Sequence, residues 1–240
     1  MRIDIWSDIV CPWCYIGKRR FERALTVFEQ RDALEIVHRS FRIDPASARG
    51  EVHKHCDRLM FKYGMSRSQA DALQIRMEQT AADEGLEFHL VGGTTGNTVD
   101  AHRLLYFARE HGVQAALLER LYCAHFTEQR SIFELDSLVA LAGEVGLDPD
   151  AAVWVLRGDR YDNAIGDDVR EAQEHGIGSV PFYLFDNRHG VSGVQPVEVF
   201  MNALILASGD SRLSAAREQI VSGVPPWQYV RGAKGTITRS

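Results

Sequence analysis

Cysteine is scarce in this chain of 240 residues, which contains four cysteines. Four are too few for the disulfide framework that replaces a hydrophobic core in small secreted proteins. No hydrophobic run approaches the roughly 20 residues that span a bilayer, and Met1 leads directly into Arg2, which leaves no room for a secretory signal. We therefore expect a soluble, cytoplasmic chain, in which closely spaced cysteines are more often catalytic or metal-binding than structural.

Long runs of lysine and arginine are also absent. The formal net charge of -6 is spread along the chain, and no basic cluster is long enough to bind nucleic acid or an anionic membrane. With 45% hydrophobic residues, the length suffices for one large core, or for one core with an inserted subdomain. The sequence therefore predicts no nucleic-acid or membrane partner, and either a monomer or a homodimer.

The first fifty residues have the pattern of a βαβ unit. Residues 2–6 and 34–43 are predicted strands, and Val10 to Phe28 between them has apolar residues at helical spacing. Residues 50–175 then show helical periodicity with glycine breaks and without strand-like alternation. This stretch is predicted to be a long helical block.

A second strand-containing unit follows the helical block. Residues 180–185 and 191–193 are predicted strands joined by a hairpin turn, and Pro196 suits the start of a helix. The order βαβ, helical block, ββα is that of a thioredoxin core interrupted by helices. We therefore expect an α/β, thioredoxin-like fold with a large all-helical insertion domain. The expected segments are residues 1–48 (first part of the thioredoxin-like domain), 49–175 (insertion), 176–222 (second part) and 223–240 (tail).

A C-x-x-C turn formed by Cys11, Pro12, Trp13 and Cys14 stands at the predicted start of the first helix. There the first sulfur is close to unpaired backbone N–H groups and to the positive end of the helix dipole, which favour a thiolate. Cys11 is therefore the candidate nucleophile, and Cys14, one turn further in, is the candidate resolving thiol. Pro12 suits the first helical turn because it has no N–H, whereas Trp13 carries no charge that stabilises the thiolate further.

Zinc binding is an alternative use of the same cysteine pair. C-x-x-C has metal-ligand spacing, and His53, His55 and Cys56 can in principle complete a site. Structural zinc usually takes its ligands from loops, so we predict that no metal is bound. His53 and His55 are then expected at a solvated helix start and Cys56 as a buried or partly buried thiol, and Cys123, in a helical run, is expected to fill the core.

Two acidic residues and a proline accompany the cysteines. Asp4 lies in the first predicted strand, where burial raises the pKa of a carboxyl and lets it accept the proton of Cys14; a solvated edge position is the alternative. Asp8, in the following loop, is expected to be exposed. Val180–Pro181 stands at the head of a strand after a glycine-rich segment, and we expect a cis peptide bond there, although cis is the minority form.

Four motifs occur in order along residues 1–208. They are Trp6-Ser7-Asp8 followed by Cys11 to Gly17, Asn97 to Leu104, Val180-Pro181-Phe182, and Val191 to Pro196. Together they resemble the DsbA family, and most closely its cytoplasmic FrnE-like branch. The resemblance implies a groove between the thioredoxin core and the helical insert, with Cys11 attacking and Cys14 resolving. It also implies that Val180, before the cis Pro181, offers its backbone to an extended substrate.

The activity implied by the resemblance is thiol-disulfide exchange on protein or small-molecule disulfides, with a thiol reductant system as partner and glutathione as a candidate co-substrate. No bound cofactor is expected beyond the Cys11–Cys14 redox disulfide. Trp13 replaces the histidine of the periplasmic members, so reduction or isomerisation is favoured over strong oxidase activity. Asn97 and His102 match the branch and are second-rank candidates for lining the groove, with a helix cap and a packed or surface histidine as the alternatives.

Two other functions fit the same fold class. Glutathione-dependent kappa-type transferases and 2-hydroxychromene-2-carboxylate isomerases generally lack a second cysteine at the matching position, so Cys14 favours redox chemistry. A binding or chaperone role with incidental thiols is the other alternative. The loop before Cys11 is also one residue longer than in periplasmic DsbA members, so Asp4 matches their buried acid only across a gap.

Overall fold

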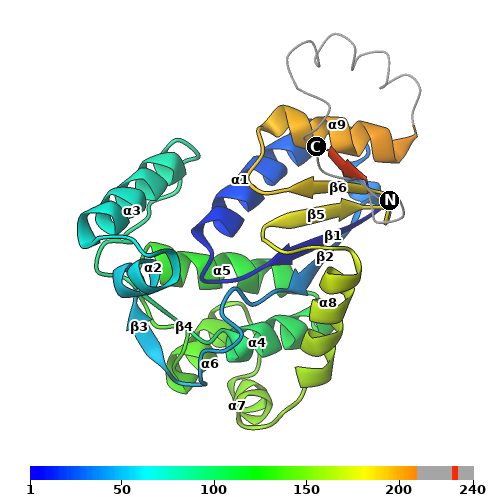
Figure 1. The fold of residues 1–240 in the computed structure, drawn as a ribbon. Helices are drawn as coiled ribbons and strands as arrows, with labels where there is room; N and C mark the ends of the chain where they lie inside the picture. Colours follow the sequence, from blue (N-terminus) through cyan, green and yellow to red (C-terminus); the bar gives the residue numbers. More distant parts are fainter. Residues whose placement is uncertain (210–228, 232–240) are drawn as a thin grey trace.

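A five-stranded mixed sheet organises the computed structural model, which describes residues 1–209 and 229–231 (Figure 1). Its strands are β1 (Arg2–Ser7), β2 (Glu35–Ser40), β5 (Phe182–Phe185), β6 (His189–Ser192) and β7 (Tyr229–Arg231). They lie in the order β2-β1-β5-β6-β7, with β1 and β2 parallel and the remaining pairs antiparallel. β1 is therefore an internal strand, with a hydrogen-bonded neighbour on each side.

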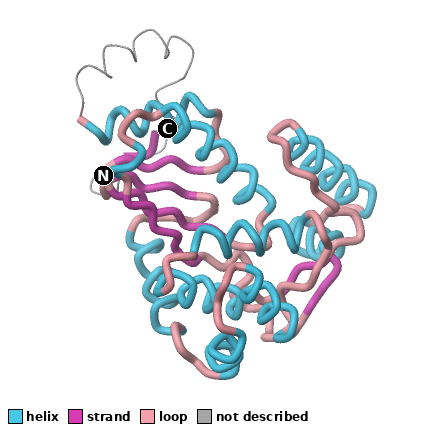
Figure 2. Tube along the Cα trace, turned by 180° about the vertical axis from the view of Figure 1, so that it is seen from behind, coloured by secondary structure: helices cyan, strands magenta, loops and turns pink. Residues whose placement is uncertain are grey.

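Three helices cover the two faces of this sheet: α1 (Pro12–Val27), α8 (Asp162–Glu174) and α9 (Val197–Ser208). Residues of β1 alternate between the faces. Ile5 lies in a hydrophobic cluster with Phe21 of α1 and Phe200 of α9, whereas Trp6 packs with Ala172 of α8. One face is thus covered by α1 and α9, and the other by α8, as Figures 1 and 2 show from opposite sides.

A helical body, joined to the sheet through β2 and α8, forms the remainder of the described chain (Figure 1). Its helices are α2 (His55–Tyr63), α3 (Arg67–Ala82), α4 (Val99–Glu110), α5 (Gln114–Phe126), α6 (Leu135–Glu144) and α7 (Pro149–Arg157). The body also contains an antiparallel ribbon of β3 (Val52–Lys54) and β4 (Thr94–Gly96). The expected all-helical insertion is therefore helical apart from this ribbon, whose strands are too short to show an alternating pattern in the sequence.

The hairpin between β5 and β6 agrees with the predicted turn. Asp186 and Asn187 have φ angles of 45° and 56°, in the left-handed region that Asp and Asn tolerate in such turns. A short 3₁₀ helix, η1 (Arg31–Ala33), leads into β2. The predicted boundary at residue 222 and most of the predicted tail lie outside the described residues, and β7 is the part of that tail that the structure describes.

The start of α1 belongs to the core of the helical body. The largest hydrophobic cluster contains Ile16 together with side chains from α3 to α7. The ring of Tyr15 stacks on Tyr122 of α5, with 4.8 Å between ring centroids, and on Phe88 at 5.7 Å. Since Phe21, further along α1, packs under the sheet, this helix is buried in two cores at once. Among the described helices, none is long and apolar enough to cross a membrane.

Candidate active site

The cysteine turn begins α1. Cys11 is the N-cap residue and Pro12 the first helical residue. The N–H of Cys14 donates to the carbonyl of Cys11 (3.0 Å), and the N–H of Cys11 donates to the carbonyl of Asp8 (3.1 Å). At this position the helix dipole and the free N–H groups of the first turn stabilise negative charge on the Cys11 sulfur.

The peptide bond between Val180 and Pro181 is cis, as predicted, and it faces the cysteine turn. Cys11 Sγ lies 3.9 Å from the carbonyl oxygen of Val180. Pro181 lines a cavity together with Cys14. The structure therefore brings the four motif residues Cys11, Cys14, Val180 and Pro181 to one place, although they are about 170 positions apart in the chain.

The two cysteines have different surroundings. Cys11 lines a groove of about 770 Å³, whereas Cys14 lines a separate cavity of about 370 Å³. Burial, together with a hydrogen bond to the Cys11 side chain, raises the pKa of the Cys14 thiol well above its usual value. Cys14 therefore keeps its proton at neutral pH until a reaction removes it.

The groove beside Cys11 combines apolar walls with positive charge. Arg42, Arg58 and Lys62 line it, with Asp44 as the carboxylate. Arg58 is paired with Asp44, whereas Arg42 and Lys62 donate to backbone carbonyl groups at 2.8 and 3.2 Å. Within the described residues, the charges of Arg42 and Lys62 have no carboxylate partner, so the groove favours anionic ligands. Its apolar lining includes Val10, Trp13, Phe41, Leu59, Tyr63, Met65, Leu73 and Met77.

Asp4 is not at the cysteines, and the expected raised pKa is wrong. Its carboxylate accepts hydrogen bonds from Arg2 (2.9 Å) and Arg39 (2.8 Å). Burial raises the pKa of Asp4, but these two hydrogen bonds outweigh burial, and the pKa is lowered. Asp4 follows Ile3 and precedes Ile5, which both face α1, so alternation places Asp4 on the opposite face of β1 from the cavity at Cys14.

Asp8 is buried, so the expectation that it is exposed is wrong. Only 1% of this residue is exposed. Its carboxylate accepts the N–H of Ile43 (2.8 Å) and lies 3.3 Å from Nε2 of His102. His102 is equally buried and lines neither the groove nor the cavity. His102 is therefore a buried histidine whose contact with Asp8 supports the loop before Cys11.

Asn97 precedes Thr98, the N-cap residue of α4, and its side chain satisfies a free N–H group at the helix start. Its Oδ1 accepts the N–H of Val99, the first residue of α4, at 2.9 Å. Its amide group donates to the carbonyl of Ser47 at 2.5 Å. Asn97 therefore fixes the start of α4 and lines neither the groove nor the cavity.

The other two cysteines lie apart from the turn. Cys56 is buried, as predicted, with its sulfur 4.0 Å from that of Met60. Cys123 is half-buried, with its sulfur 3.6 Å from a carboxylate oxygen of Glu128, so the prediction that it fills the core is wrong. Among the described residues, no group of three or more His, Cys, Asp or Glu side chains could hold a metal ion.

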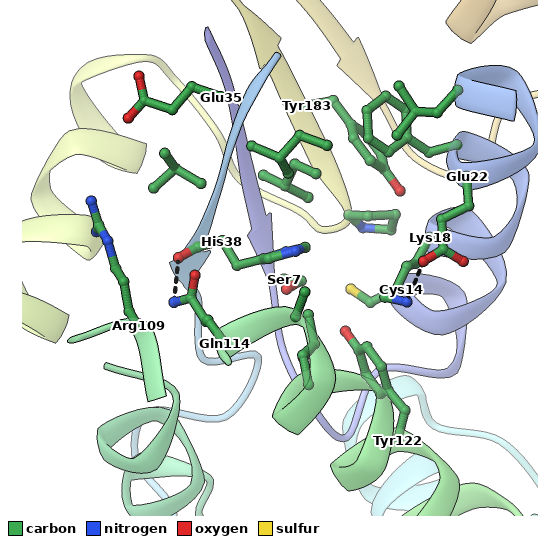
Figure 3. Close-up of a pocket in the computed structure, with 18 of the residues that line it drawn as sticks. Ser7, Cys14, Lys18, Glu22, Glu35, His38, Arg109, Gln114, Tyr122 and Tyr183 are labelled. Atoms are coloured by element: carbon green, nitrogen blue, oxygen red, sulfur yellow. Dashed lines mark hydrogen bonds and ion pairs between the residues drawn. The ribbon is translucent and has the colours of Figure 1, made fainter. Parts of the chain in front are cut away.

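Three polar residues beside Cys14 were missed from the sequence. His38 on β2, and Lys18 and Glu22 on α1, line the cavity with Cys14 (Figure 3). His38 is paired in register with Ile5 of β1, whose side chain faces α1. A histidine in a strand predicted to adjoin the first strand was the available signal, but the sequence does not show which face it occupies.

The motif resemblance is borne out when the chain is compared with known families. Residues 2–205 match the family described as DSBA-like thioredoxin domain. The chain belongs to this family. The predicted thioredoxin-like fold is thereby confirmed, while its assignment to the FrnE-like branch stays a prediction.

Solved structures similar to this DsbA-like chain differ in their described activities. The probable DsbA oxidoreductase SCO1869 from Streptomyces coelicolor is 45% identical, with a TM-score of 0.84 and coverage of 88% of this chain and 91% of that one. 2-Hydroxychromene-2-carboxylate isomerase is 17% identical (TM-score 0.59, coverage 92% and 100%). The cytosolic disulfide reductase DsbM from Pseudomonas aeruginosa with GSH is 16% identical (TM-score 0.53, coverage 92% and 99%). The latter two share the fold.

Gly17 provides a test of how closely α1 must approach the cis proline. A Cβ atom at this position lies 2.8 Å from the hydroxyl of Tyr183 and 3.0 Å from Cγ of Pro181. We expect Gly17→Ala to displace α1 and to lower the free energy of unfolding by about 1–3 kcal/mol, together with the rate of disulfide exchange. Urea unfolding and an insulin-reduction assay measure the two effects.

Gly166→Ala is the matched control. Gly166 also lies within a helix, α8, but a Cβ there meets only Arg170 Nη1, at 3.8 Å. This variant should keep the exchange rate and should not lose stability, because alanine inside a helix is favoured over glycine by about 0.5–1 kcal/mol. Equal behaviour of the two variants contradicts the close packing of α1 on Pro181.

Proposed function

We propose that this protein is a cytoplasmic disulfide reductase or isomerase in which Cys11 attacks and Cys14 resolves. The observation that carries the proposal is the asymmetry of the turn. Cys11 lies at the N-cap of α1 on the wall of the groove, and the protonated Cys14 lies behind it. An attacking sulfur at a helix start on the wall of a groove, with a second thiol one turn away, is the arrangement that disulfide exchange requires.

The reaction proceeds in two exchanges. The Cys11 thiolate attacks a substrate disulfide, which forms a mixed disulfide and releases one substrate sulfur as a thiolate. Cys14 then loses its proton and attacks the Cys11 sulfur, so the second substrate sulfur leaves and the Cys11–Cys14 disulfide forms. The substrate gains two electrons, and a cellular thiol reductant returns them to the cysteine pair.

The backbone of Val180 is the proposed substrate contact. Its carbonyl is already within 3.9 Å of the Cys11 sulfur, so an extended chain that pairs with Val180 passes over the attacking atom. Backbone pairing of this kind tolerates many side chains and favours a broad substrate range.

Trp13 supports reduction or isomerisation over strong oxidation. Its side chain is uncharged, lies between the cysteines in the sequence and is only partly buried. Without a positive charge at that position, the reduced thiolate form gains no additional stabilisation, which makes the pair less oxidising. The described activity of the DsbM reductase is consistent with this direction.

Cysteine variants test the assignment of roles. We expect Cys11→Ser to abolish insulin disulfide reduction, because the remaining thiol of the turn, Cys14, is buried and protonated. Cys14→Ser should also lose turnover but accumulate a mixed disulfide on Cys11, detectable by mass spectrometry. Cys123→Ser, which removes a thiol remote from the turn, should retain the activity.

The same variants distinguish the competing functions. If Cys14→Ser retained full turnover of a glutathione-linked isomerisation substrate while the native protein never reduced insulin, a glutathione-dependent isomerase or transferase would replace this proposal. If the variant lacking both cysteines suppressed aggregation as well as the native protein, while the native protein had no reductase activity, a chaperone role would replace it.

Glutathione disulfide is the proposed small-molecule substrate. Glutathione carries carboxylates at both ends, and the groove presents Arg42 and Lys62 without carboxylate partners among the described residues. The structure of DsbM with GSH, which shares the fold, gives this proposal further support. Protein disulfides remain substrates of the same groove.

Charge reversal tests the anionic preference. Each paired surface charge contributes up to about 1 kcal/mol, and charge reversal replaces an attraction with a repulsion of similar size. Arg42→Glu and Lys62→Glu should therefore each raise KM for glutathione disulfide about threefold to tenfold. Turnover of the uncharged bis(2-hydroxyethyl) disulfide should not change. Arg76→Glu, at an exposed position of α3 outside the groove, is the control. An equal loss with both substrates contradicts a charge-based preference.

A further inference from the structure

The cavity that Cys14 lines shares no lining residue with the groove beside Cys11. It measures about 370 Å³ and lies between α1, β2, α5 and β5 (Figure 3). A water molecule occupies about 30 Å³ in the liquid, so there is room for several. The cavity therefore leaves room for water beside the resolving thiol, away from the groove.

Resolution requires that Cys14 lose a proton, and the high pKa of its thiol makes this step depend on an acceptor. The titratable groups that line the cavity with Cys14 are Lys18, Glu22, Glu35, His38, Arg109, Tyr122 and Tyr183. Asp4, the candidate acceptor from the sequence, does not line the cavity.

Most of these groups are unsuited to accept the proton. Burial, with a smaller contribution from the nearby cysteine sulfurs, raises the pKa of Tyr122 and of Tyr183 well above the usual value, so both hydroxyls keep their protons. Lys18 and Arg109 are cations. The carboxylate of Glu22 is already paired with two cations, Lys18 at 2.5 Å and Arg19 at 2.8 Å. Glu35 has a side chain that is 64% exposed, so it lies at the cavity's edge, toward solvent.

His38 differs from all of them. Its Nδ1 is buried and has no hydrogen-bond partner among the described residues. Figure 3 shows the imidazole directed across the cavity toward Cys14 and Lys18. The main chain of His38 is fixed by pairing of β2 with β1 and by Gln114, which donates to its carbonyl at 3.3 Å. Burial, and then the charge of Lys18, lower the pKa of His38 to about 4, so the ring is neutral at pH 7 and one nitrogen can accept a proton.

We propose that His38 accepts, through water in the cavity, the proton that Cys14 loses when it resolves the mixed disulfide. This inference rests on the proposed function. When the Cys14 S–H proton moves to the imidazole, the Cys14 thiolate attacks the Cys11 sulfur. The Cys11–Cys14 bond forms as the bond between Cys11 and the substrate sulfur breaks, and the substrate leaves as a thiolate. The imidazolium returns its proton to water, so His38 is regenerated in each turnover.

A single-turnover reaction with 5,5′-dithiobis(2-nitrobenzoate) separates the two exchanges. In a Cys123→Ser background, attack by the reduced Cys11 releases one equivalent of thionitrobenzoate, and resolution by Cys14 releases the second. We expect His38→Gln to leave the first phase unchanged and to slow the second about tenfold at pH 6. His89→Gln, an exposed histidine outside the cavity, should leave both phases unchanged.

The pH profile distinguishes proton transfer from a packing defect. The native second phase should be nearly constant between pH 5.5 and 7.5 and fall at lower pH as His38 becomes protonated. In His38→Gln it should rise with pH throughout, because solvent must take the proton. Added imidazole should accelerate the second phase of His38→Ala, which has space for it, and this variant also covers the case in which glutamine is not tolerated.

The outcomes separate this inference from the proposed function. If the native protein releases only one equivalent, the Cys11–Cys14 exchange itself fails. If it releases two equivalents, and the second phase of His38→Gln or His38→Ala keeps the native rate and pH profile, or imidazole gives no rescue, then the role of His38 is refuted while the exchange reaction stands.

Discussion

The burial of α1 in two hydrophobic cores is the constraint on which the site depends. Tyr15 and Ile16 pack into the helical body, while Phe21 packs under the sheet. A helix that is buried on only one side could rotate or slide, but one that contributes to two cores can do neither without loss of packing in one of them. The turn at Cys11 is therefore held at a defined distance from Val180, which enters from the far end of the chain.

The position of the helical body follows from the same constraint. The helical body follows β2 in the chain and leads back to the sheet through α8. Its side chains contact the residues around the cysteines. Tyr122 of α5 stacks on Tyr15, and His102 of α4 contacts Asp8. The helical body is consequently part of the support of the cysteine turn as well as one wall of the groove.

The two sides of the turn differ in chemistry because different side chains line them. The Cys11 side has apolar walls and basic side chains that suit an anionic or extended disulfide substrate. The Cys14 side has a histidine, a lysine–glutamate pair and tyrosines around a space large enough for water. In the proposed mechanism the disulfide reacts on the Cys11 side, and the proton of Cys14 leaves on the other side.

Local sequence signals accounted for the features that local interactions determine. The cysteine turn, the hairpin at Asp186 and the strand beginning after Pro181 have turn residues or periodicities of their own, and they are found as predicted. The environments of Asp4 and Asp8 were mispredicted because their partners lie elsewhere in the chain. Arg39 is 35 positions from Asp4, and His102 is 94 positions from Asp8.

His38 is a functional candidate that the sequence did not reveal, for the same reason. Nothing in its neighbourhood in the sequence distinguishes it from other polar residues of a strand. Its position beside Cys14 arises from the pairing of β2 with β1 and the packing of α1 on that face of the sheet. Contacts between distant segments determine where His38 lies, and these contacts cannot be predicted from the pattern of a single sequence.

The reduction potential of the Cys11–Cys14 pair tests the central claim most directly. The protein is equilibrated with glutathione buffers of increasing oxidised fraction, quenched with acid, and the intramolecular disulfide is quantified by mass spectrometry. A reversible two-electron transition between about -270 and about -180 mV, the range from thioredoxin to protein disulfide isomerase, is the predicted result. A pair that forms no internal disulfide at any glutathione ratio would contradict the account.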